Sequence, residues 1–425
     1  MSKKIGLLAL GGHISNQNAT FNEMMRQLSG SDWEFYGLRN GFEAFKTGEV
    51  YPMDRHTVFS IFAGFYAGAT RASLTKKDGT LDDRMVEDAV SFSRATGFDY
   101  LVGSGGDDHG IQMNILGEIL ESKGIPTKVL VSNKTMDGDK GGKDGETIGG
   151  YVGPFADTTN GFHTAINQGV NVINTSLSGA WTNEVVTIVP HFGRDANWVN
   201  LALGWYGNAD VVIPGEFPEG HPGHSIDTIA KAIMEAREEN LRRYGRAFAT
   251  VVVSEGTKIE GIEQASSTLR DTAHGHVKLN PEILAVGLKE ALDKYGLKSQ
   301  SEVVTYSMRN SRTSNMDGYL ATLTGQTLAT AILEGITGME AVLKFDCGVV
   351  VSKLVPINLA SQKRFARYRE EHTGRPFYDR VTLKPLPEIG DYFRPLFVDR
   401  KEIESLLPRK PTVVNVYSKP QITSQ

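Results

Sequence analysis

Short apolar stretches alternate along the chain with segments whose apolar residues recur every three or four positions. The first pattern predicts buried strands and the second predicts amphipathic helices. Their alternation is typical of parallel α/β layers. The expected strands, with the turns that follow them, cover residues 4–12, 98–106, 127–133, 184–192, 209–217 and 247–256. The expected helices cover residues 18–30, 84–97, 111–124, 225–245 and 319–335.

The length of the chain indicates more than one domain. A chain of 425 residues is too long for one compact core. We expect two Rossmann-like α/β domains of three layers each, facing a cleft, at residues 1–150 and 151–305. Residues 306–350 would return to the first domain, and residues 351–425 would form an extension on the surface. Residues 132–161 are rich in Gly and Asp with little apolar periodicity, so they are either a linker or a functional loop.

Composition excludes several classes of protein. Hydrophobic residues make up 40% and charged residues 22%, which is ordinary for a soluble globular protein. The formal net charge of −5 provides no overall basic field, which argues against nucleic acid and membrane partners. Cys347 is the only cysteine, so an internal disulfide is impossible and a thiolate metal site is excluded. No apolar run is long enough for a signal peptide or a membrane span. We expect a cytoplasmic location.

Four aspartates follow two of the expected strands. Asp107 and Asp108 come after a pair of glycines, and Asp137 and Asp139 come shortly after Lys134. A single Asp at a strand end is most simply a turn residue that bonds its own backbone. Four of them, beside glycines and a lysine, exceed what turns require. Hard oxygen ligands, glycines that allow close backbone approach and a lysine are what a magnesium-bound polyphosphate needs.

These residues belong to a set of motifs that resembles the phosphofructokinase family. The chain reads GGDD at 105–108, NKTMDGD at 133–139, TNGFHTA at 159–165, FGRDANW at 192–198 and IPGEF at 213–217. In the family the corresponding motifs commonly read GGDG or GGDD, PKTIDND or PKTIDGD, TFGFDTA, MGRxxGW and IPE. GLRNGFEAF at 37–45 and VVVSEG at 251–256 are also similar. The resemblance runs from about residue 4 to 350, and five motifs in the same order make it specific.

The resemblance implies a transfer of a phosphoryl group to a sugar hydroxyl with Mg²⁺ as cofactor. Asp137 would accept the hydroxyl proton, which contributes typically 10²–10⁴-fold. Asp139 would orient the site, Arg194 would neutralise charge during transfer, and Asp107 would hold the metal. Further implied contacts are Gly11, Gly12, Gly106, Asp108, Lys134 and Lys140 for the donor, and Thr135, Gly193, Arg194, Glu216, Tyr306 and Arg309 for the substrate.

Asp108 indicates the donor by the same resemblance. Family members have Gly at this position where ATP is the donor and Asp where pyrophosphate is, because a carboxylate repels the α-phosphate of a nucleotide. Gly138 is also the pyrophosphate-type residue, and Lys140 lies one position before the usual lysine. The simpler interpretation is that Asp108 caps a helix that begins near Ile111. We expect pyrophosphate as the donor and the 1-hydroxyl of fructose 6-phosphate as the acceptor, in glycolysis or gluconeogenesis.

The acceptor side departs from the family pattern. Val185 and Gln300 occupy positions that are usually Arg. A pocket with fewer guanidinium groups holds a phosphate dianion less well. Two alternatives stay open: a kinase of the same fold that acts on another sugar, sugar phosphate or polyol, and a non-catalytic regulatory homologue. Clustered carboxylates, which repel one another, argue against the second. The family also implies a homo-oligomer, a dimer or a tetramer.

Overall fold

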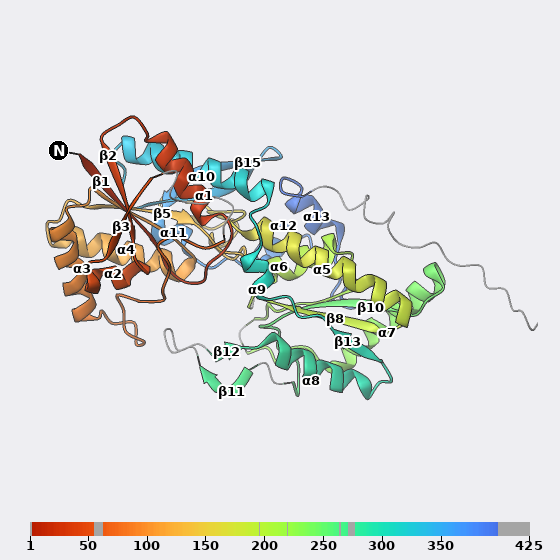
Figure 1. Cartoon of the computed structure of the whole chain (residues 1–425). Coiled ribbons are helices and arrows are strands. Elements are labelled where there is room, and N and C mark those ends of the chain that lie inside the picture. Colours follow the sequence, from red (N-terminus) through yellow and green to blue (C-terminus); the bar gives the residue numbers. More distant parts are fainter. Residues whose placement is uncertain are drawn as a thin grey trace, which may run out of the picture.

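Two sheets with mostly parallel strands organise the chain (Figure 1). The structure is a computed structural model and describes residues 2–54, 63–194, 196–218, 220–262, 265–270 and 277–397. The larger sheet has the strand order β15-β14-β5-β4-β1-β2-β3, and the smaller sheet has the order β13-β8-β10-β9. Helices cover the faces of both sheets, so the predicted α/β class is confirmed.

The larger sheet is parallel in its middle and antiparallel at its two edges. Its middle strands are buried and read as continuous apolar runs, as expected where helices cover both faces. The parallel strands are β1 (Lys3–Ala9), β2 (Trp33–Leu38), β4 (Tyr100–Gly105), β5 (Lys128–Asn133) and β14 (Met339–Asp346). The edge strands β3 (Val50–Met53) and β15 (Val349–Pro356) run antiparallel to their neighbours.

Alternate residues of β1 pack against different helices. Ile5 and Leu7 contact a core that includes Phe21 of α1 (Gln17–Gln27) and Leu328 of α10 (Asn315–Leu333). Leu8 points to the other face, into the core formed with α3 (Asp83–Thr96) and α4 (Asp107–Ser122). The shorter helices η1 (Gly41–Glu43), α2 (Ala44–Thr47) and α11 (Ile357–Ala360) also lie on this second face. The larger sheet therefore has helices on both faces.

The smaller sheet is entirely parallel and supports the second half of the cavity described below. Its strands are β8 (Val186–His191), β9 (Val211–Ile213), β10 (Ala249–Ser254) and β13 (Ser299–Ser301). Its main helices are α5 (Phe162–Asn183), α6 (Asn197–Tyr206), α7 (Ile226–Tyr244) and α8 (Pro281–Asp293). The remaining elements are β6 (Thr147–Ile148), β7 (Tyr151–Val152), β11 (Ala265–Arg270), β12 (Val277–Leu279), α9 (Tyr306–Asn310), α12 (Ala366–Thr373) and α13 (Pro387–Phe393).

Residues 351–397 of the C-terminal region pack into the larger sheet and the second core, which differs from the predicted surface extension. The predicted boundary at residue 351 falls inside β15, which pairs with β14 along eight residues. Farther on, Arg364 is fully buried, and its guanidinium carbon lies 3.9 Å from the ring centroid of Trp198. Tyr392 and Phe393 of α13 pack on the same Trp198 ring. These aromatic residues enter the second core without a regular period, which is why the sequence looked irregular.

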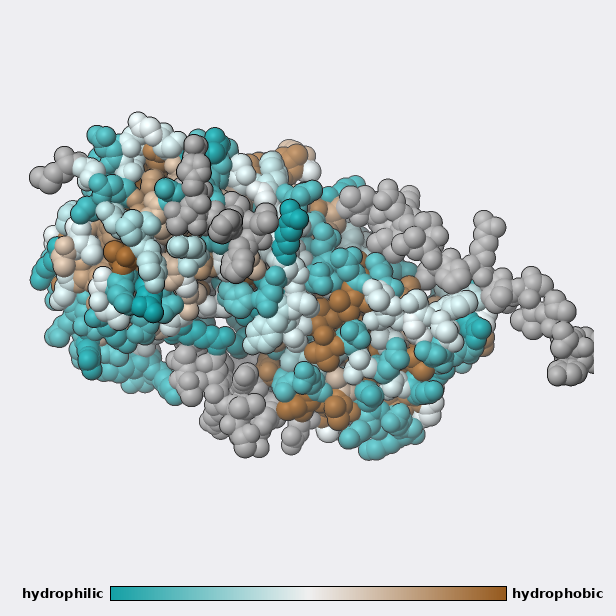
Figure 2. Space-filling view, in the orientation of Figure 1, coloured by the Kyte–Doolittle hydropathy of each residue, from teal (hydrophilic) through white to brown (hydrophobic). Residues whose placement is uncertain are grey.

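Figure 2 shows polar side chains over most of one face, with apolar side chains gathered near α5 and α8. Val286 of α8 is an example of such an exposed apolar residue. Within the described ranges, no helix combines the length and the apolar character that crossing a bilayer would demand.

Candidate active site

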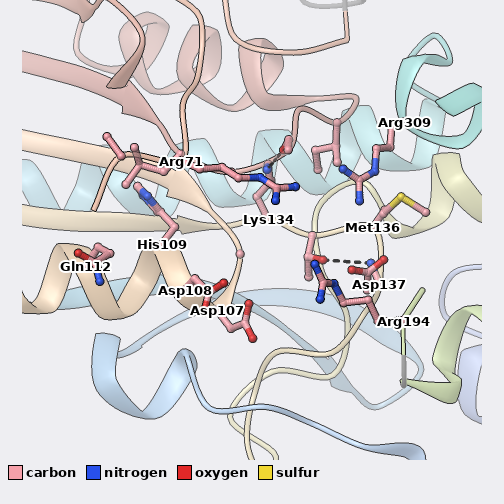
Figure 3. Close-up of a pocket in the computed structure, with 17 residues that line it drawn as sticks. Arg71, Asp107, Asp108, His109, Gln112, Lys134, Met136, Asp137, Arg194 and Arg309 are labelled. Carbon is pink, nitrogen blue, oxygen red and sulfur yellow. Dashed lines mark hydrogen bonds between the residues drawn. The ribbon is translucent and has the colours of Figure 1, made fainter. Parts of the chain in front are cut away.

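A cavity of about 140 Å³ lies where the carboxyl ends of β1, β4, β5 and β8 approach one another (Figure 3). Ligands of parallel sheets are expected at these ends. Ten of the residues predicted from the motifs line this cavity: Gly11, Gly12, Gly106, Asp107, Asp108, Lys134, Thr135, Asp137, Arg194 and Arg309. Segments more than 290 residues apart in the sequence therefore meet in one place.

The first turn of α4 brings two carboxylates to the cavity. Gly106 is the N-cap residue, and the helix begins at Asp107. Asp108 therefore lies inside the first turn, and the interpretation that it caps a helix beginning near Ile111 is wrong. Burial, together with the charge of Asp108, raises the pKa of Asp107. Helix N-termini favour anions, so this turn can hold both carboxylates and, with a cation, phosphate oxygens.

The loop after β5 provides the candidate base. The backbone N–H of Asp137 donates to Thr135 Oγ1 at 3.1 Å, which fixes the turn (Figure 3). Asp137 Oδ1 is buried and has no hydrogen-bond partner among the described residues. A buried, unpaired carboxylate oxygen that borders a cavity is costly unless a ligand or water completes it. Asp137 is therefore available to accept a proton from a bound hydroxyl.

Four basic side chains face the cavity: Arg71, Lys134, Arg194 and Arg309. Lys134 donates from Nζ to the carbonyl of Gly12. Burial lowers the pKa of Lys134 to about 7, and the charge of Arg309 acts in the same direction. Burial also lowers the pKa of Arg71, and Arg194 and Arg309 add to that effect. These cations repel one another until an anion binds between them, so the cavity favours a multiply charged anion.

Two glycines lie where the chain passes these cations. Gly12 lies against the guanidinium of Arg309, and a Cβ there would overlap it. Arg309 in turn lies 4.8 Å above the ring of Phe192. Gly193 has φ 145°, and it precedes Arg194, whose φ is 47°. Gly193 itself does not line the cavity, but it allows the turn that directs Arg194 into it.

Asp139, Glu216 and Tyr306 lie outside the cavity, in contrast to the predictions made for them. The two oxygens of Glu216 accept backbone N–H groups of Asn197 at 2.6 Å, Ala366 at 2.9 Å and Arg367 at 2.9 Å. This carboxylate joins the N-termini of α6 and α12, and it does not line the cavity. Asp139 is buried, and its carbonyl accepts from Arg364 N–H at 2.7 Å. The side chain of Tyr306 is largely exposed.

Lys140 and Gly138 also differ from their predicted roles. Lys140 is fully buried, and its Nζ lies 2.5 Å from Glu340 Oε1 in a fully buried ion pair. It does not line the cavity, because the chain after Asp139 turns into the protein. Gly138 has φ 69°, and a Cβ there would lie 3.1 Å from the ring of Phe162. The positive φ and the nearby ring of Phe162 favour glycine at this position.

The two positions without the usual arginine also lie outside the cavity. Val185 is buried, and Gln300 Nε2 donates to Thr187 Oγ1 at 3.0 Å across β13 and β8. Neither side chain supplies positive charge. Of the residues predicted to contact the substrate, Arg194 and Arg309 are therefore the cations that reach the cavity.

Further residues lie at the cavity or near Asp137 that were not given a role from the motifs. Arg71 lines the cavity, as does His109, a buried ring whose two nitrogens have no hydrogen-bond partner in the described part of the chain. Glu255 follows β10 and is 7% exposed. Burial and the nearby charge of Asp137 raise the pKa of Glu255 to about 7, while Arg194 opposes them. The signal for Glu255 was a carboxylate directly after a buried apolar strand, within VVVSEG at 251–256.

A magnesium ion fits this site only together with a phosphate ligand. No group of three or more His, Cys, Asp or Glu that could hold a metal occurs within the described ranges. Mg²⁺ usually takes one or two carboxylates, the phosphates of its substrate and water. Asp107 and Asp108 supply two carboxylates beside a cavity with cations for the phosphates. This donor set fits a magnesium–polyphosphate complex.

The cavity lies at the strand ends of two helix-covered sheets, and it offers carboxylates, four cations and an unpaired base. This arrangement is that of a phosphotransferase of the nucleotide or polyphosphate type. The family model described as Phosphofructokinase matches residues 4–332 of the chain. The chain therefore belongs to the phosphofructokinase family. Members of this family are transferases of glycolysis that generally use Mg²⁺.

Relatives of both donor types are similar to the chain. Over 349 residues it is 26% identical to the pyrophosphate–fructose 6-phosphate 1-phosphotransferase of Amycolatopsis mediterranei (strain S699). The matched region covers 80% of this chain and 90% of that relative. Over 364 residues it is 24% identical to the ATP-dependent 6-phosphofructokinase of Clostridium botulinum (strain Alaska E43 / Type E3). Here the matched region covers 85% of this chain and 96% of that relative. The crystal structure of a pyrophosphate-dependent phosphofructokinase from Marinobacter aquaeolei matches with a TM-score of 0.70 at 18% identity, over 93% of this chain and 91% of that one. The fold is shared, and the donor is not decided by these relatives.

Proposed function

We propose that the protein transfers a phosphoryl group from pyrophosphate to the 1-hydroxyl of fructose 6-phosphate, with Mg²⁺ at Asp107. The observation that carries the choice of donor is the position of Asp108. Its carboxylate is exposed in the first turn of α4, next to Asp107 and on the border of the cavity. Pyrophosphate ends at its second phosphate, whereas a nucleotide would bring a third phosphate and a ribose past this charge.

Each residue at the cavity has a separate role in the proposed phosphoryl transfer. Asp137 takes the proton of the attacking hydroxyl, because its Oδ1 is buried, unpaired and at the cavity. Arg194, Lys134 and Arg71 stabilise the charge on the equatorial oxygens during transfer. Glu255 accepts a hydrogen bond from the acceptor sugar beside Asp137. Asp107 would hold magnesium, which would neutralise negative charge on the phosphates.

Coulomb's law gives a scale for the selection of the donor. Two unit charges about 4 Å apart interact by about 4 kcal/mol at an effective dielectric constant of about 20, and by about 1 kcal/mol in water. The α-phosphate of ATP beside Asp108 would therefore lower the preference for ATP by a factor of roughly ten to a thousand. Pyrophosphate avoids that repulsion because it has no further phosphate to place there.

The test is a comparison of donors with the purified protein. Formation of fructose 1,6-bisphosphate is measured with pyrophosphate and with ATP, each with Mg²⁺, and the two kcat/KM values are compared. We expect activity with pyrophosphate and at least tenfold less with ATP. A wild-type protein that prefers ATP would contradict the proposed donor, and one that forms no product with either donor would contradict the proposed reaction.

Acceptors other than fructose 6-phosphate should also be assayed, because the acceptor side has less positive charge than the family pattern predicts. Val185 and Gln300 supply no guanidinium group, and Arg309 is directed toward Gly12 in the cavity. This distribution favours an acceptor with less negative charge than fructose 6-phosphate. A panel of free sugars, polyols and sugar phosphates, with pyrophosphate as the donor, distinguishes these acceptors by kcat/KM.

We also propose a cytoplasmic homo-oligomer on the basis of the family. Light scattering after gel filtration tests the number of subunits.

A further inference from the structure

A buried carboxylate in the first turn of α10 binds the first turn of α5. Asp317 is fully buried. Its Oδ1 accepts the N–H of Gly161 at 2.9 Å, and its Oδ2 accepts the N–H of Thr164 at 2.7 Å. The hydroxyl of Thr164 donates to the same Oδ2. The N-cap residue of α5 is Gly161, which has no side chain to offer. Asp317 therefore caps α5 from a distant part of the chain.

This contact joins the two halves of the molecule. α10 lies beside α1 over the larger sheet, and α5 lies over the smaller sheet (Figure 1). Leu328 of α10 belongs to the core of the larger sheet, whereas Ile166 of α5 belongs to the core of the smaller sheet. A carboxylate at a helix N-terminus is favourable because the N–H groups there point at it. Asp317 thus helps to fix α5, and with it the smaller sheet, against the larger sheet.

The same carboxylate group contacts the loop that follows β1. Asn16 is the N-cap residue of α1, four residues after Gly12 of the cavity. Its Nδ2 lies 3.4 Å from Asp317 Oδ1 and donates to the Asp317 carbonyl at 3.3 Å and to Asn160 Oδ1 at 2.9 Å. These contacts form one cluster, called the polar joint below, whose members are each at most 2% exposed: Asn16, Asn160, Thr164 and Asp317.

Two more segments of the cavity connect to the polar joint. Asn160 Nδ2 donates at 2.9 Å to the carbonyl of Asn133, the residue before Lys134. Thr313 Oγ1 accepts the backbone N–H of the α1 N-cap residue at 3.1 Å, and Thr313 follows Arg309 by four residues. Lys134 and Arg309 both line the cavity. The polar joint therefore holds segments that carry cavity residues from three distant parts of the chain.

Phosphoryl transfer needs groups from both sheets at once. The candidate base Asp137 follows β5 of the larger sheet, and Arg194 follows β8 of the smaller sheet. Transfer depends on the alignment of such groups, and a displacement of about 1 Å can cost about 10²-fold in rate. The donor contacts Gly11, Gly12, Gly106 and Lys134 all follow strands of the larger sheet. A loosened joint should therefore impair transfer more than it impairs donor binding.

We propose that Asp317 is a positioning residue for phosphoryl transfer, which keeps Arg194 on the smaller sheet in register with Asp137 on the larger sheet. Asp317 does not line the cavity, so it acts through the segments that the polar joint holds. This inference rests on the proposed phosphoryl transfer, but it does not depend on which donor is used.

The test compares two Asp-to-Asn variants of the full chain. Asp317→Asn replaces an acceptor oxygen by an NH₂ group that faces a backbone N–H. Asp210→Asn is the control, because Asp210 also accepts a backbone N–H, that of Thr250 at 2.7 Å, and the side chain of Asn240 at 2.9 Å. Both of its partners belong to the half with the smaller sheet.

The assays separate transfer from donor binding. We expect Asp317→Asn to lose about ten- to a hundredfold in kcat. Its affinity for magnesium pyrophosphate, measured by titration calorimetry without an acceptor, should stay close to that of wild type. Asp210→Asn should keep both values, even if it unfolds at a lower temperature. An equal loss of kcat in Asp210→Asn, or a loss of affinity as large as the loss of kcat in Asp317→Asn, would overturn the positioning role.

A pair of variants at Thr164 keeps the inference testable if Asp317→Asn does not fold. Thr164→Val removes the hydroxyl that donates to Asp317 and should lower kcat, whereas Thr164→Ser keeps the hydroxyl and should recover most of it. Wild-type kcat in folded Asp317→Asn or in Thr164→Val contradicts the role of the joint. A wild type that prefers ATP contradicts only the proposed donor, and the variants are then compared with ATP. A wild type that forms no product with either donor and any acceptor of the panel overturns the proposed function and this inference with it.

Discussion

Replacing Glu255 with Gln should make the protein more stable and less active at the same time. Glu255 is 7% exposed, and burial, with Asp137 beside it, raises its pKa from the ordinary 4.5 to about 7. Each pKa unit corresponds to about 1.4 kcal/mol, so the ionised carboxylate destabilises the folded state by about 3 kcal/mol. Glutamine keeps the shape and does not ionise.

The sign and the pH range follow from the two pKa values. Above pH 7 the carboxylate is ionised in both the folded and the unfolded state, so the folded wild type carries the full destabilisation. Between pH 4.5 and pH 7 the unfolded state is ionised while the folded state becomes protonated, and the destabilisation falls. Below pH 4.5 both states are protonated, and it vanishes. Glu255→Gln should therefore exceed wild type by about 3 kcal/mol at pH 8 and by almost nothing at pH 4.5.

Urea unfolding at pH 5 and pH 8, followed by circular dichroism, measures this difference. The control is Glu184→Gln, because the hydrogen bond from Arg246 lowers the pKa of the exposed Glu184. That control should lose stability at pH 8 relative to wild type, the opposite sign. In kinetic assays Glu255→Gln should lose about tenfold or more in kcat/KM for the acceptor and keep its pyrophosphate affinity. A variant that is no more stable than wild type at pH 8 refutes the buried, ionised carboxylate; normal acceptor kinetics refutes its role at the acceptor.

The remaining predictions concern the donor side and the base. Asp137→Asn should bind substrates normally and lose about 10²–10⁴-fold in kcat, and near-normal turnover would place the base elsewhere. Asp107→Ala should raise the Mg²⁺ concentration needed for activity, whereas full wild-type activity in excess chelator would speak against a metal there. Asp108→Gly should shift the ATP-to-pyrophosphate ratio of kcat/KM toward ATP by roughly ten- to a thousandfold; an unchanged ratio argues against repulsion. Lys140→Met should destabilise the fold by about 3–5 kcal/mol in urea unfolding, and Lys140→Met/Glu340→Met should recover most of it; an inactive but stable double variant would return Lys140 to the donor site.

The sequence predicted the strands that are buried on both faces, and it missed β2 and β14 together with most edge strands. Strands such as β1, β4 and β10 read as apolar runs that a local pattern detects, and so does the edge strand β9. The edge strands β13 and β3 lack that signal. β13 reads SQS and β3 reads VYPM, and each is recognisable only through the neighbour that it pairs with. Pairing of this kind depends on contacts between distant residues, which a local pattern does not contain.

Residues predicted for the site line the cavity where a strand end fixes their direction. Gly106, Asp107 and Lys134 come immediately after β4 or β5 and line the cavity. A few residues into a loop, the direction of a side chain depends on what packs against it. Glu216 faces the N-termini of two helices and Lys140 faces Glu340, although Glu216 lies within a motif and Lys140 directly follows one. A motif gives the position of such a residue in the chain, and the packing around it gives its partner.

The C-terminal region shows why the donor cannot be read from the matched motifs alone. Glu340 pairs with Lys140 and keeps it out of the cavity, and Arg364 anchors the segment that bonds to the loop after β5. Both Glu340 and Arg364 lie beyond residue 332, where the family match ends. Asp108 borders the cavity, whereas Lys140 does not. Asp108→Gly should therefore shift the ratio of ATP to pyrophosphate use, whereas Lys140→Met/Glu340→Met should leave that ratio unchanged, because only the first variant alters charge at the cavity.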